Sequence, residues 1–173
     1  MKFFSHAWAA RDDSEADQAP AAYARHLISL PGPAGEAARQ VANAFALADA
    51  LIDQVTLNRR LARLTVALVI SEESYGYERL QLSYGDVLIE TGAIEVARRA
   101  AESRLTRVRY DEFDRSDLDD GRLLHRFSFW PRRFGELQVP FRTLQILRGP
   151  LKGRHWTHLG EPFVDQNADD DSD

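Results

Sequence analysis

One stretch of the chain, residues 122–148, alternates between apolar and polar side chains with the period of a β-strand. A short connection that contains Gly135, residues 131–135, interrupts the alternation, as is typical of a β-hairpin. We therefore predict two antiparallel strands with one apolar face and one face that carries arginines. The apolar face is predicted to hold Leu123, His125, Phe127, Phe129, Leu137, Val139 and Phe141.

Two features of the second strand of this hairpin predict irregular pairing. Pro140 has no backbone N–H to donate, so we expect it at a sheet edge or near a bulge. After Thr143 the apolar positions move to Leu144 and Ile146, which changes the parity of the alternation. A single bulge residue in a continuing strand would produce this change.

The rest of the chain predicts helices and further strands. Pro20 is a typical first helical residue, and apolar residues three and four apart predict a second helix. Runs with a period of two, separated by short turns, predict an antiparallel meander. The predicted helices are residues 20–28, 34–48 and 93–105. The predicted strands are residues 52–57, 61–70, 77–90 and 105–110, followed by an acidic loop, residues 111–121.

Together these elements predict an α+β fold, in which two N-terminal helices pack on a mostly antiparallel, twisted sheet of about five strands. The 173 residues suffice for one domain with a core of its own. We expect a single domain, residues 1–160, and an acidic, mobile tail, residues 161–173. No apolar run is long enough to span a bilayer, so we expect a cytoplasmic protein without membrane contact.

Charge is distributed unevenly along the chain, whose net charge is -5. Residues 121–160 are basic, with Glu136 as their single acid, and acidic segments precede and follow them. Arginines beside aromatic residues bind carboxylates, phosphates or protein surfaces. Alternatively, the flanking acids pair with these arginines inside the same molecule. The candidate binding residues, for a protein or an anion, are Arg126, Trp130, Arg132, Arg133 and Arg142.

Motifs tied to a definite chemistry are missing from the sequence. It contains no cysteine, no glycine-rich phosphate loop, no Gly-x-Ser-x-Gly elbow and no His-Glu-x-x-His motif. Residues 111–121 fail the spacing of a calcium-binding EF-hand loop, and His155 and His158 lie in a predicted loop. We interpret His125 as a neutral, buried histidine. No catalytic residue, metal ligand or cofactor is therefore predicted.

Several short motifs resemble a bacterial family of unknown function. They are the opening Met1-Lys2-Phe3-Phe4-Ser5, the step Tyr110-Asp111-Glu112, and a later hairpin that runs from His125 to Val139. Members of that family open M-K-[YF]-F-[TS] and carry Y-D-E-[IF] before a C-terminal hairpin. The chain has Ala48 where the family pattern has a histidine, so no role of that residue carries over. The resemblance implies a cytosolic bacterial domain and supplies no activity, substrate or catalytic residue.

The function expected from these observations is protein interaction, as in an adaptor or an immunity-type inhibitor, without catalysis. One alternative is a nucleic-acid-binding protein that uses the arginines and aromatic residues of the hairpin. A second alternative is a metal-assisted hydrolase that uses the Asp111–Asp120 loop and His125. The second alternative requires the side chains of Asp111, Glu112, Asp114 and His125 to lie together in one cleft.

Overall fold

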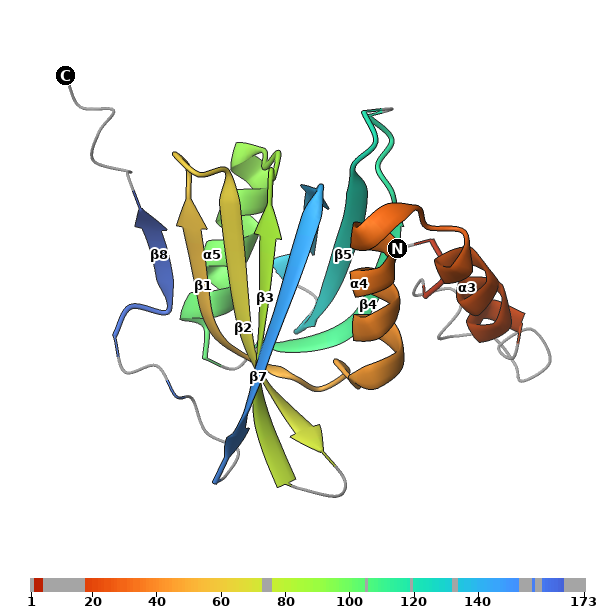
Figure 1. Cartoon of the computed structure of the whole chain (residues 1–173). Helices are drawn as coiled ribbons and strands as arrows, with labels where there is room; N and C mark the ends of the chain where they lie inside the picture. The colour runs from red at the N-terminus through yellow and green to blue at the C-terminus, as the bar shows by residue number, and fades with distance from the viewer. Residues whose placement is uncertain are drawn as a thin grey trace.

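The computed structural model of the protein contains three helices and one eight-stranded sheet among the residues that it describes (Figure 1). The described residues are 2–4, 18–72, 76–104, 106–118, 120–131, 134–152, 157 and 160–166. The helices are α3 (Gln18–Ile28), α4 (Gly32–Ala44) and α5 (Thr91–Glu102). The strands are β1 (Leu51–Asn58), β2 (Arg63–Glu72), β3 (Gly76–Gly85), β4 (Arg107–Arg115), β5 (Leu123–Trp130), β6 (Glu136–Phe141), β7 (Thr143–Leu151) and β8 (Phe163–Gln166). The α+β class is confirmed, but the sheet is larger than the predicted five strands.

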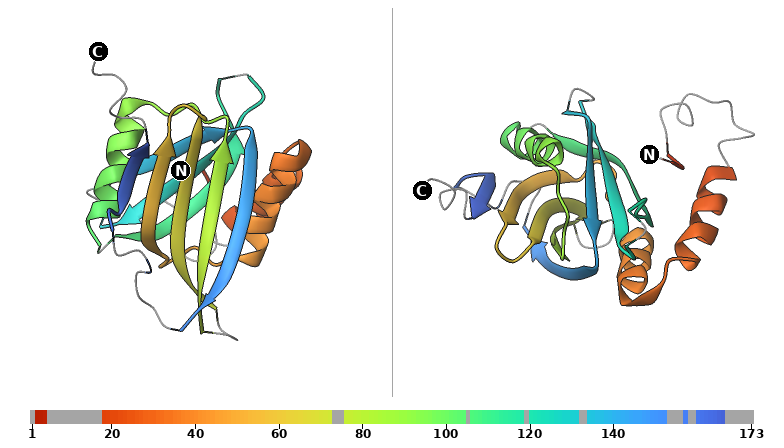
Figure 2. Two further views of the ribbon diagram at one scale, coloured as in Figure 1. Left: turned by 60° about the vertical axis from the view of Figure 1, so that its left-hand side comes forward. Right: turned by 90° about the horizontal axis from the view of Figure 1, so that it is seen from above.

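The order of the strands requires the sheet to curl. The strands follow the path β6-β5-β4-β1-β2-β3-β7, and β8 pairs with β1 beside this path. All pairs are antiparallel except β1 with β8. The terminal strands β6 and β7 are consecutive in the chain, with only Arg142 between them. Because neighbouring strands lie about 4.8 Å apart, one residue joins the two ends only if the sheet bends back on itself. Figure 2 shows this curvature.

The curled sheet forms two layers that enclose the hydrophobic core. Figure 1 shows β1, β2, β3 and β7 in front of β4 and β5. The layers separate between β1 and β4, which share a single residue pair, Leu51 with Arg107. Helix α5 packs against β1 and β6, and α4 packs against β7, so that the two helices lie on opposite sides of the strands (Figure 2).

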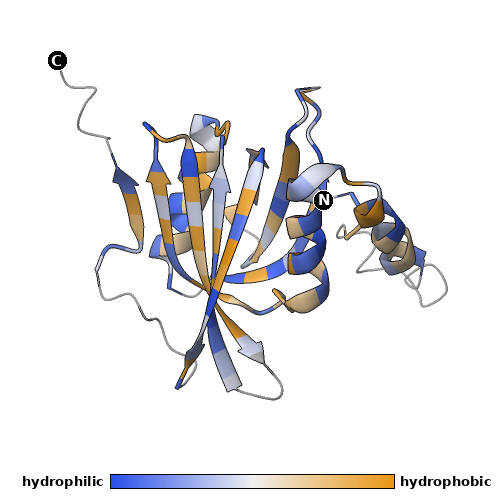
Figure 3. Ribbon diagram, viewed as in Figure 1, coloured by the Kyte–Doolittle hydropathy of each residue, from blue (hydrophilic) through white to orange (hydrophobic). Residues whose placement is uncertain are grey.

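Alternating side chains fill the space between the layers, as the striped hydropathy of the strands indicates (Figure 3). Leu64, Val66, Leu68 and Ile70 on β2 are buried, as the period of two predicts. The predicted apolar face of the hairpin is also confirmed, because each of its members is at most 2 % exposed. Strands β5 and β6 pair antiparallel, with Pro140 on the terminal strand of the sheet path.

The predicted bulge after Thr143 is instead a corner between two strands. Strand β6 ends at Phe141, and β7 begins at Thr143 and pairs with β3 rather than with β5. At the corner, the Arg142 N–H donates to the carbonyl of Gly85 at 3.1 Å. The change of parity in the sequence therefore marks the place where the chain crosses from one layer to the other.

Three predicted boundaries are corrected by the structure. The predicted acidic loop is wrong for residues 111–115, which belong to β4 because the Phe113 side chain is buried in the core. The third predicted strand ends at Gly85, since Asp86 adopts a φ of 53° that is incompatible with a strand. The second helix ends at Ala44 rather than at residue 48. The helix predicted for residues 93–105 overlaps α5, which begins at Thr91 and ends at Glu102.

Part of the predicted C-terminal tail belongs to the sheet, because Phe163–Gln166 forms β8 and pairs with β1. Earlier in the chain, Thr157 is held by Asp53 of β1, and the Asp53 side chain is fully buried. The Asp53 carboxylate accepts hydrogen bonds from the Thr157 N–H at 2.6 Å and from Arg79 Nε at 3.0 Å. Residues 167–173 lie outside the described part of the chain.

Candidate interaction site around β4, β5 and β6

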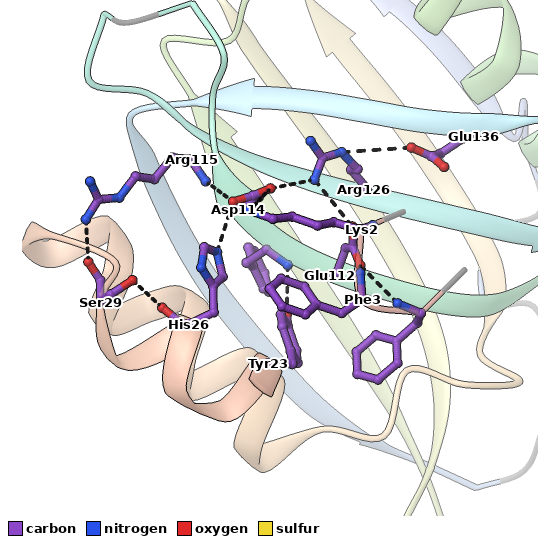
Figure 4. A network of polar contacts seen from close by, with 12 residues as sticks. Lys2, Phe3, Tyr23, His26, Ser29, Glu112, Asp114, Arg115, Arg126 and Glu136 are labelled. Atoms are coloured by element: carbon purple, nitrogen blue, oxygen red, sulfur yellow. Dashed lines mark hydrogen bonds and ion pairs between the residues drawn. The ribbon is translucent and has the colours of Figure 1, made fainter. Parts of the chain in front are cut away.

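Arg126, a predicted binding residue, lies on the outer face of β5 among carboxylates. The sheet register places Glu112 of β4 directly opposite it. Arg126 Nη1 lies 3.0 Å from Asp114 Oδ2 and 3.3 Å from Glu112 Oε1, and Arg126 Nε lies 4.0 Å from Glu136 Oε1 (Figure 4). The side chain is 12 % exposed. The guanidinium charge is therefore neutralised within the molecule.

Residues 2–4 cover the fully buried carboxylate of Glu112 from the outside. The Phe3 and Phe4 N–H groups donate to Glu112 Oε2 at 2.8 and 3.3 Å, and the Lys2 N–H donates to Glu112 Oε1 (Figure 4). The rings of Phe3 and Phe4 pack against Tyr23 of α3, with centroids 5.3 and 5.1 Å away. The Lys2-Phe3-Phe4 segment is thus held beside β4 by its backbone N–H groups and by its aromatic rings.

Asp114, next to Glu112 on the same face, has a pKa below its ordinary value. Burial of the carboxylate raises the pKa, but hydrogen bonds from Arg126 and from the Arg115 N–H, with the charges of Lys2 and Arg126, outweigh it. His26 Nε2 of α3 also lies 2.9 Å from Asp114 Oδ1. Asp114 is therefore ionised and shared between the charged groups of Arg126 and Lys2.

Of the other predicted binding residues, the two that the structure describes, Trp130 and Arg142, do not join Arg126 in one cationic surface. Trp130 is on the same face of β5 and is 56 % exposed, but it lies at the far end of the strand. Arg142 lies at the corner between β6 and β7, where its Nε is 3.0 Å from Asp86 Oδ2. Its Nη2 donates to the carbonyl of Asp120 at 2.9 Å. Arg132 and Arg133 lie outside the described residues.

A buried polar chain that the sequence did not predict runs through the core. His125 Nε2 lies 3.1 Å from Asp111 Oδ2, and His125 Nδ1 lies 2.7 Å from the Tyr84 hydroxyl. Because an ionised carboxylate only accepts hydrogen bonds, the imidazole proton is on Nε2, and Nδ1 accepts from Tyr84. The sequence feature that indicates the burial of Tyr84 is the alternation along β3, which places Tyr84 on the same face as the buried Leu80 and Leu82.

Burial shifts the pKa values of two members of this polar network, His125 and Tyr84. Desolvation lowers the pKa of His125 below its ordinary value, against the opposing effect of the hydrogen bond and charge of Asp111. Desolvation and the charge of Asp111 raise the pKa of Tyr84. Phe113 stacks on the imidazole with a centroid distance of 3.7 Å. His125 is thus the neutral, buried histidine expected from its place in the hairpin.

The four residues of the hydrolase alternative do not gather in one cleft. Asp111 and His125 meet on the inner face of the sheet, whereas Glu112 and Asp114 contact Arg126 on the outer face. Within the described residues, no group of three or more histidine and acidic side chains is arranged to hold a metal ion. Asp119 of the acidic loop, His155 and His158 are outside these residues.

An open groove of about 410 Å³ lies along the outer face of β5 and β6. It adjoins Arg126 and the carboxylates that contact it, because Glu136 is part of its lining. Its lining residues come from four segments of the chain, namely β5, β6, the stretch from Leu88 into the start of α5, and the turn after β4. Its lining is Leu88, Glu90, Gly92, Ala93, Val96, Ser116, Asp117, Leu118, Leu124, Glu136, Gln138 and Pro140. Sequence reasoning missed this groove because its walls come from four separate segments.

A second hollow, of about 520 Å³, lies where the start of α4 meets β7. Arg142 is the one charged residue among the described residues that line it. The guanidinium group of Arg142 is already held by Asp86 and by the carbonyl of Asp120. This hollow therefore offers a bound ligand little beyond apolar contact.

Comparison of the chain with protein-family models, curated proteins and solved structures found no match. No helix in the described ranges has both the length and the apolar character needed to cross a membrane. The function is consequently inferred from the chemistry of the site itself.

Proposed function

We propose that this chain is a non-enzymatic protein-interaction domain of the bacterial cytosol, of adaptor or immunity type. In this proposal the partner binds in the groove between α5 and β6. The observation that carries it is the pair of exposed leucines among the residues that line the groove, Leu88 at 50 % and Leu118 at 51 % exposure. Together with Leu124 and Pro140, they give the groove an apolar part beside its polar and acidic lining residues, as recognition sites commonly have.

The energetics favour this groove over the arginines as the binding surface. Covering the exposed half of each leucine would contribute roughly 1 kcal/mol per side chain, from about 25 cal/mol per Å² of apolar surface. In contrast, a partner that engages Arg126 has to compete with Glu112 and Asp114 for the guanidinium. Removing one partner from a buried ion pair costs several kcal/mol. The groove binds without such a loss.

A selection from a library of random, displayed 12-residue peptides tests the proposal. We expect the immobilised chain to enrich peptides whose affinity falls at least about fivefold in the variant Leu118→Ser, because one partly buried leucine is worth about 1 kcal/mol. The matched control is Leu147→Ser on β7, where the leucine is 63 % exposed and outside the groove lining. Enrichment of no peptide, or of peptides that tolerate Leu118→Ser, would contradict the proposal.

A further inference from the structure

Strand β6 ends the sheet path, so one of its two edges pairs with no other strand of the described chain. This free edge of β6 borders the groove, because Glu136, Gln138 and Pro140 are among the lining residues. Edge strands present unpaired backbone N–H and C=O groups, which pair readily with an added strand. The backbone groups at this edge therefore bear on what the groove binds.

Two hydrogen bonds show which backbone groups of β6 point toward its free edge. The Leu88 N–H donates to the carbonyl of Pro140 at 3.2 Å, on the side away from β5. Just after β6, the Arg142 N–H donates to the carbonyl of Gly85 at 3.1 Å on the same side. In an antiparallel ladder, residues two apart along a strand point their N–H and C=O groups the same way. The register of β5 with β6 has no shift, so the Gln138 backbone points to the free edge as well.

The backbone of Gln138 is open at this edge. Among the described residues, neither its N–H nor its C=O has a hydrogen-bond partner on the side away from β5. The start of α5 contributes Gly92 and Ala93 to the lining of the groove, and a Cβ atom at Gly92 would meet nothing within 4 Å. These small residues leave room for another backbone to approach.

Resting on the proposed function, we infer that the occupant of the groove is an extended segment of the partner protein, which adds to the sheet as a strand along the free edge of β6. The segment accepts a hydrogen bond from the Gln138 N–H and donates one to the Gln138 C=O. Because the Leu88 N–H already holds Pro140, the added strand is short and runs from Gln138 toward the start of β6. Alternate side chains of an extended segment share one side, and we expect one set to cover Leu118.

Backbone N-methylation of a peptide tests this mode of binding. The peptide is one that the unaltered chain selects and that depends on Leu118, and its affinity is measured by fluorescence anisotropy with one position methylated at a time. We expect a loss of at least about tenfold where the peptide N–H bonds to Gln138, and none of that size at the two neighbouring positions. Equal tolerance at all positions, or equal losses at adjacent positions, would overturn the added strand.

Amide hydrogen exchange of the full chain, followed by NMR, tests the same bonds from the side of the protein. In the free protein the Gln138 N–H should exchange faster than those of Leu137 and Val139, which point toward β5. Binding of the peptide should slow the exchange of Gln138 at least about tenfold.

A pair of variants separates the backbone of Gln138 from its side chain. Gln138→Pro removes the N–H at a position equivalent to that of Pro140 in the ladder, and it should weaken peptide binding about three- to tenfold. The matched control, Gln138→Ala, keeps the N–H and should leave affinity within about twofold. N-methylation and hydrogen exchange use the unaltered protein, so they test the proposal independently of these variants.

The two proposals fail in different ways. Peptides that depend on Leu118 but leave the exchange of Gln138 unchanged would overturn the added strand and leave the groove as the binding site. Equal affinities for Gln138→Pro and Gln138→Ala would overturn it in the same way, because the N–H would then contribute nothing. If no selected peptide depends on Leu118, the groove itself is not the binding surface, and both proposals fall.

Discussion

Arg126 is the residue that allows three carboxylates to occupy one face of the sheet. Glu112 is fully buried and Asp114 nearly so, and both contact the same guanidinium group. Buried acids are tolerated only when they are paired and hydrogen-bonded. Residues 2–4 complete this pairing from outside β4, with backbone N–H groups on Glu112 and with Lys2 Nζ 3.5 Å from Asp114 Oδ2. The arginine that the sequence marked as a binding residue thus has a structural role in the described molecule.

Replacing Arg126 with glutamate would place a fourth carboxylate among Glu112, Asp114 and Glu136. We expect the free energy of unfolding at neutral pH to fall by about 3–5 kcal/mol, because buried charges lose their partner and meet a like charge. Urea denaturation measures this loss. The control is Arg148→Glu, since Arg148 is 63 % exposed and lies 4.0 Å from Glu78; it should cost less than about 1 kcal/mol. Similar losses in the two variants would contradict the role assigned to Arg126.

His125 makes the stability of the protein depend on pH. Its pKa in the folded protein is lowered by burial, while in the unfolded chain it takes the ordinary value near 6.5. Below about pH 6.5 the unfolded chain binds the proton more readily, so His125 lowers the free energy of unfolding progressively as pH falls. Above that pH its contribution is constant.

The titration is measured from the imidazole C–H resonances of the protein by NMR. We expect the His125 signals to keep the shifts of the neutral ring at pH values where an exposed histidine is already protonated. Protonation of His125 near pH 6.5 would show that burial does not control its pKa.

At the scale of helices and strands, the periodic spacing of apolar residues in the sequence predicted those elements that bury one face and expose the other. The hairpin of β5 and β6 was predicted because its inner face is uniformly apolar. The sequence did not predict that Asp111 to Arg115 form a strand. The acidic side chains of this strand lie against Lys2, His26 and Arg126, which are distant in sequence. The alternation of apolar and polar residues in a sequence does not reveal charged partners that come from distant parts of the chain.

Close packing of α4 against the end of α3 depends on Gly35. A Cβ atom at this position would lie 2.4 Å from the backbone carbonyl oxygen of Leu30, which accepts a hydrogen bond from Arg39 Nη1 at 3.0 Å. We therefore expect Gly35→Ala to lower the free energy of unfolding by about 1–3 kcal/mol, as overpacking does. Chemical denaturation followed by circular dichroism gives this value.

Gly92→Ala is the matched control for this substitution. Gly92 is also helical, and a Cβ atom there meets nothing within 4 Å. Alanine should leave the stability unchanged or raise it by up to about 1 kcal/mol, through its higher helix propensity. A Gly35→Ala variant as stable as Gly92→Ala would mean that the contact with Leu30 does not constrain the packing of the helices.

At the scale of the whole molecule, the site depends on closure of the sheet. The turn after β4, the outer face of β5 and β6, and the start of α5 meet only because β6 and β7 join the two ends of the curled sheet. The sequence placed Arg126 and Trp130 correctly on one face of β5, since that needs only the period of a strand. It did not predict the groove, because which segments meet there depends on the topology of the complete sheet.

The last strand, β8, provides a test of where the domain ends. Truncation after Gly160 removes the hydrogen bond from the Val55 N–H to Pro162, the ion pair of Arg59 with Asp165 and the pairing of β8 with β1. We expect a loss of about 2–4 kcal/mol in the free energy of unfolding and self-association through the opened edge of β1, measured by urea denaturation and light scattering. Truncation after Gln166 keeps these contacts and should match the full chain in both measurements. If the two truncated proteins are equally stable and have the same mass in solution, β8 contributes nothing to the cooperative fold, and the domain ends at residue 160.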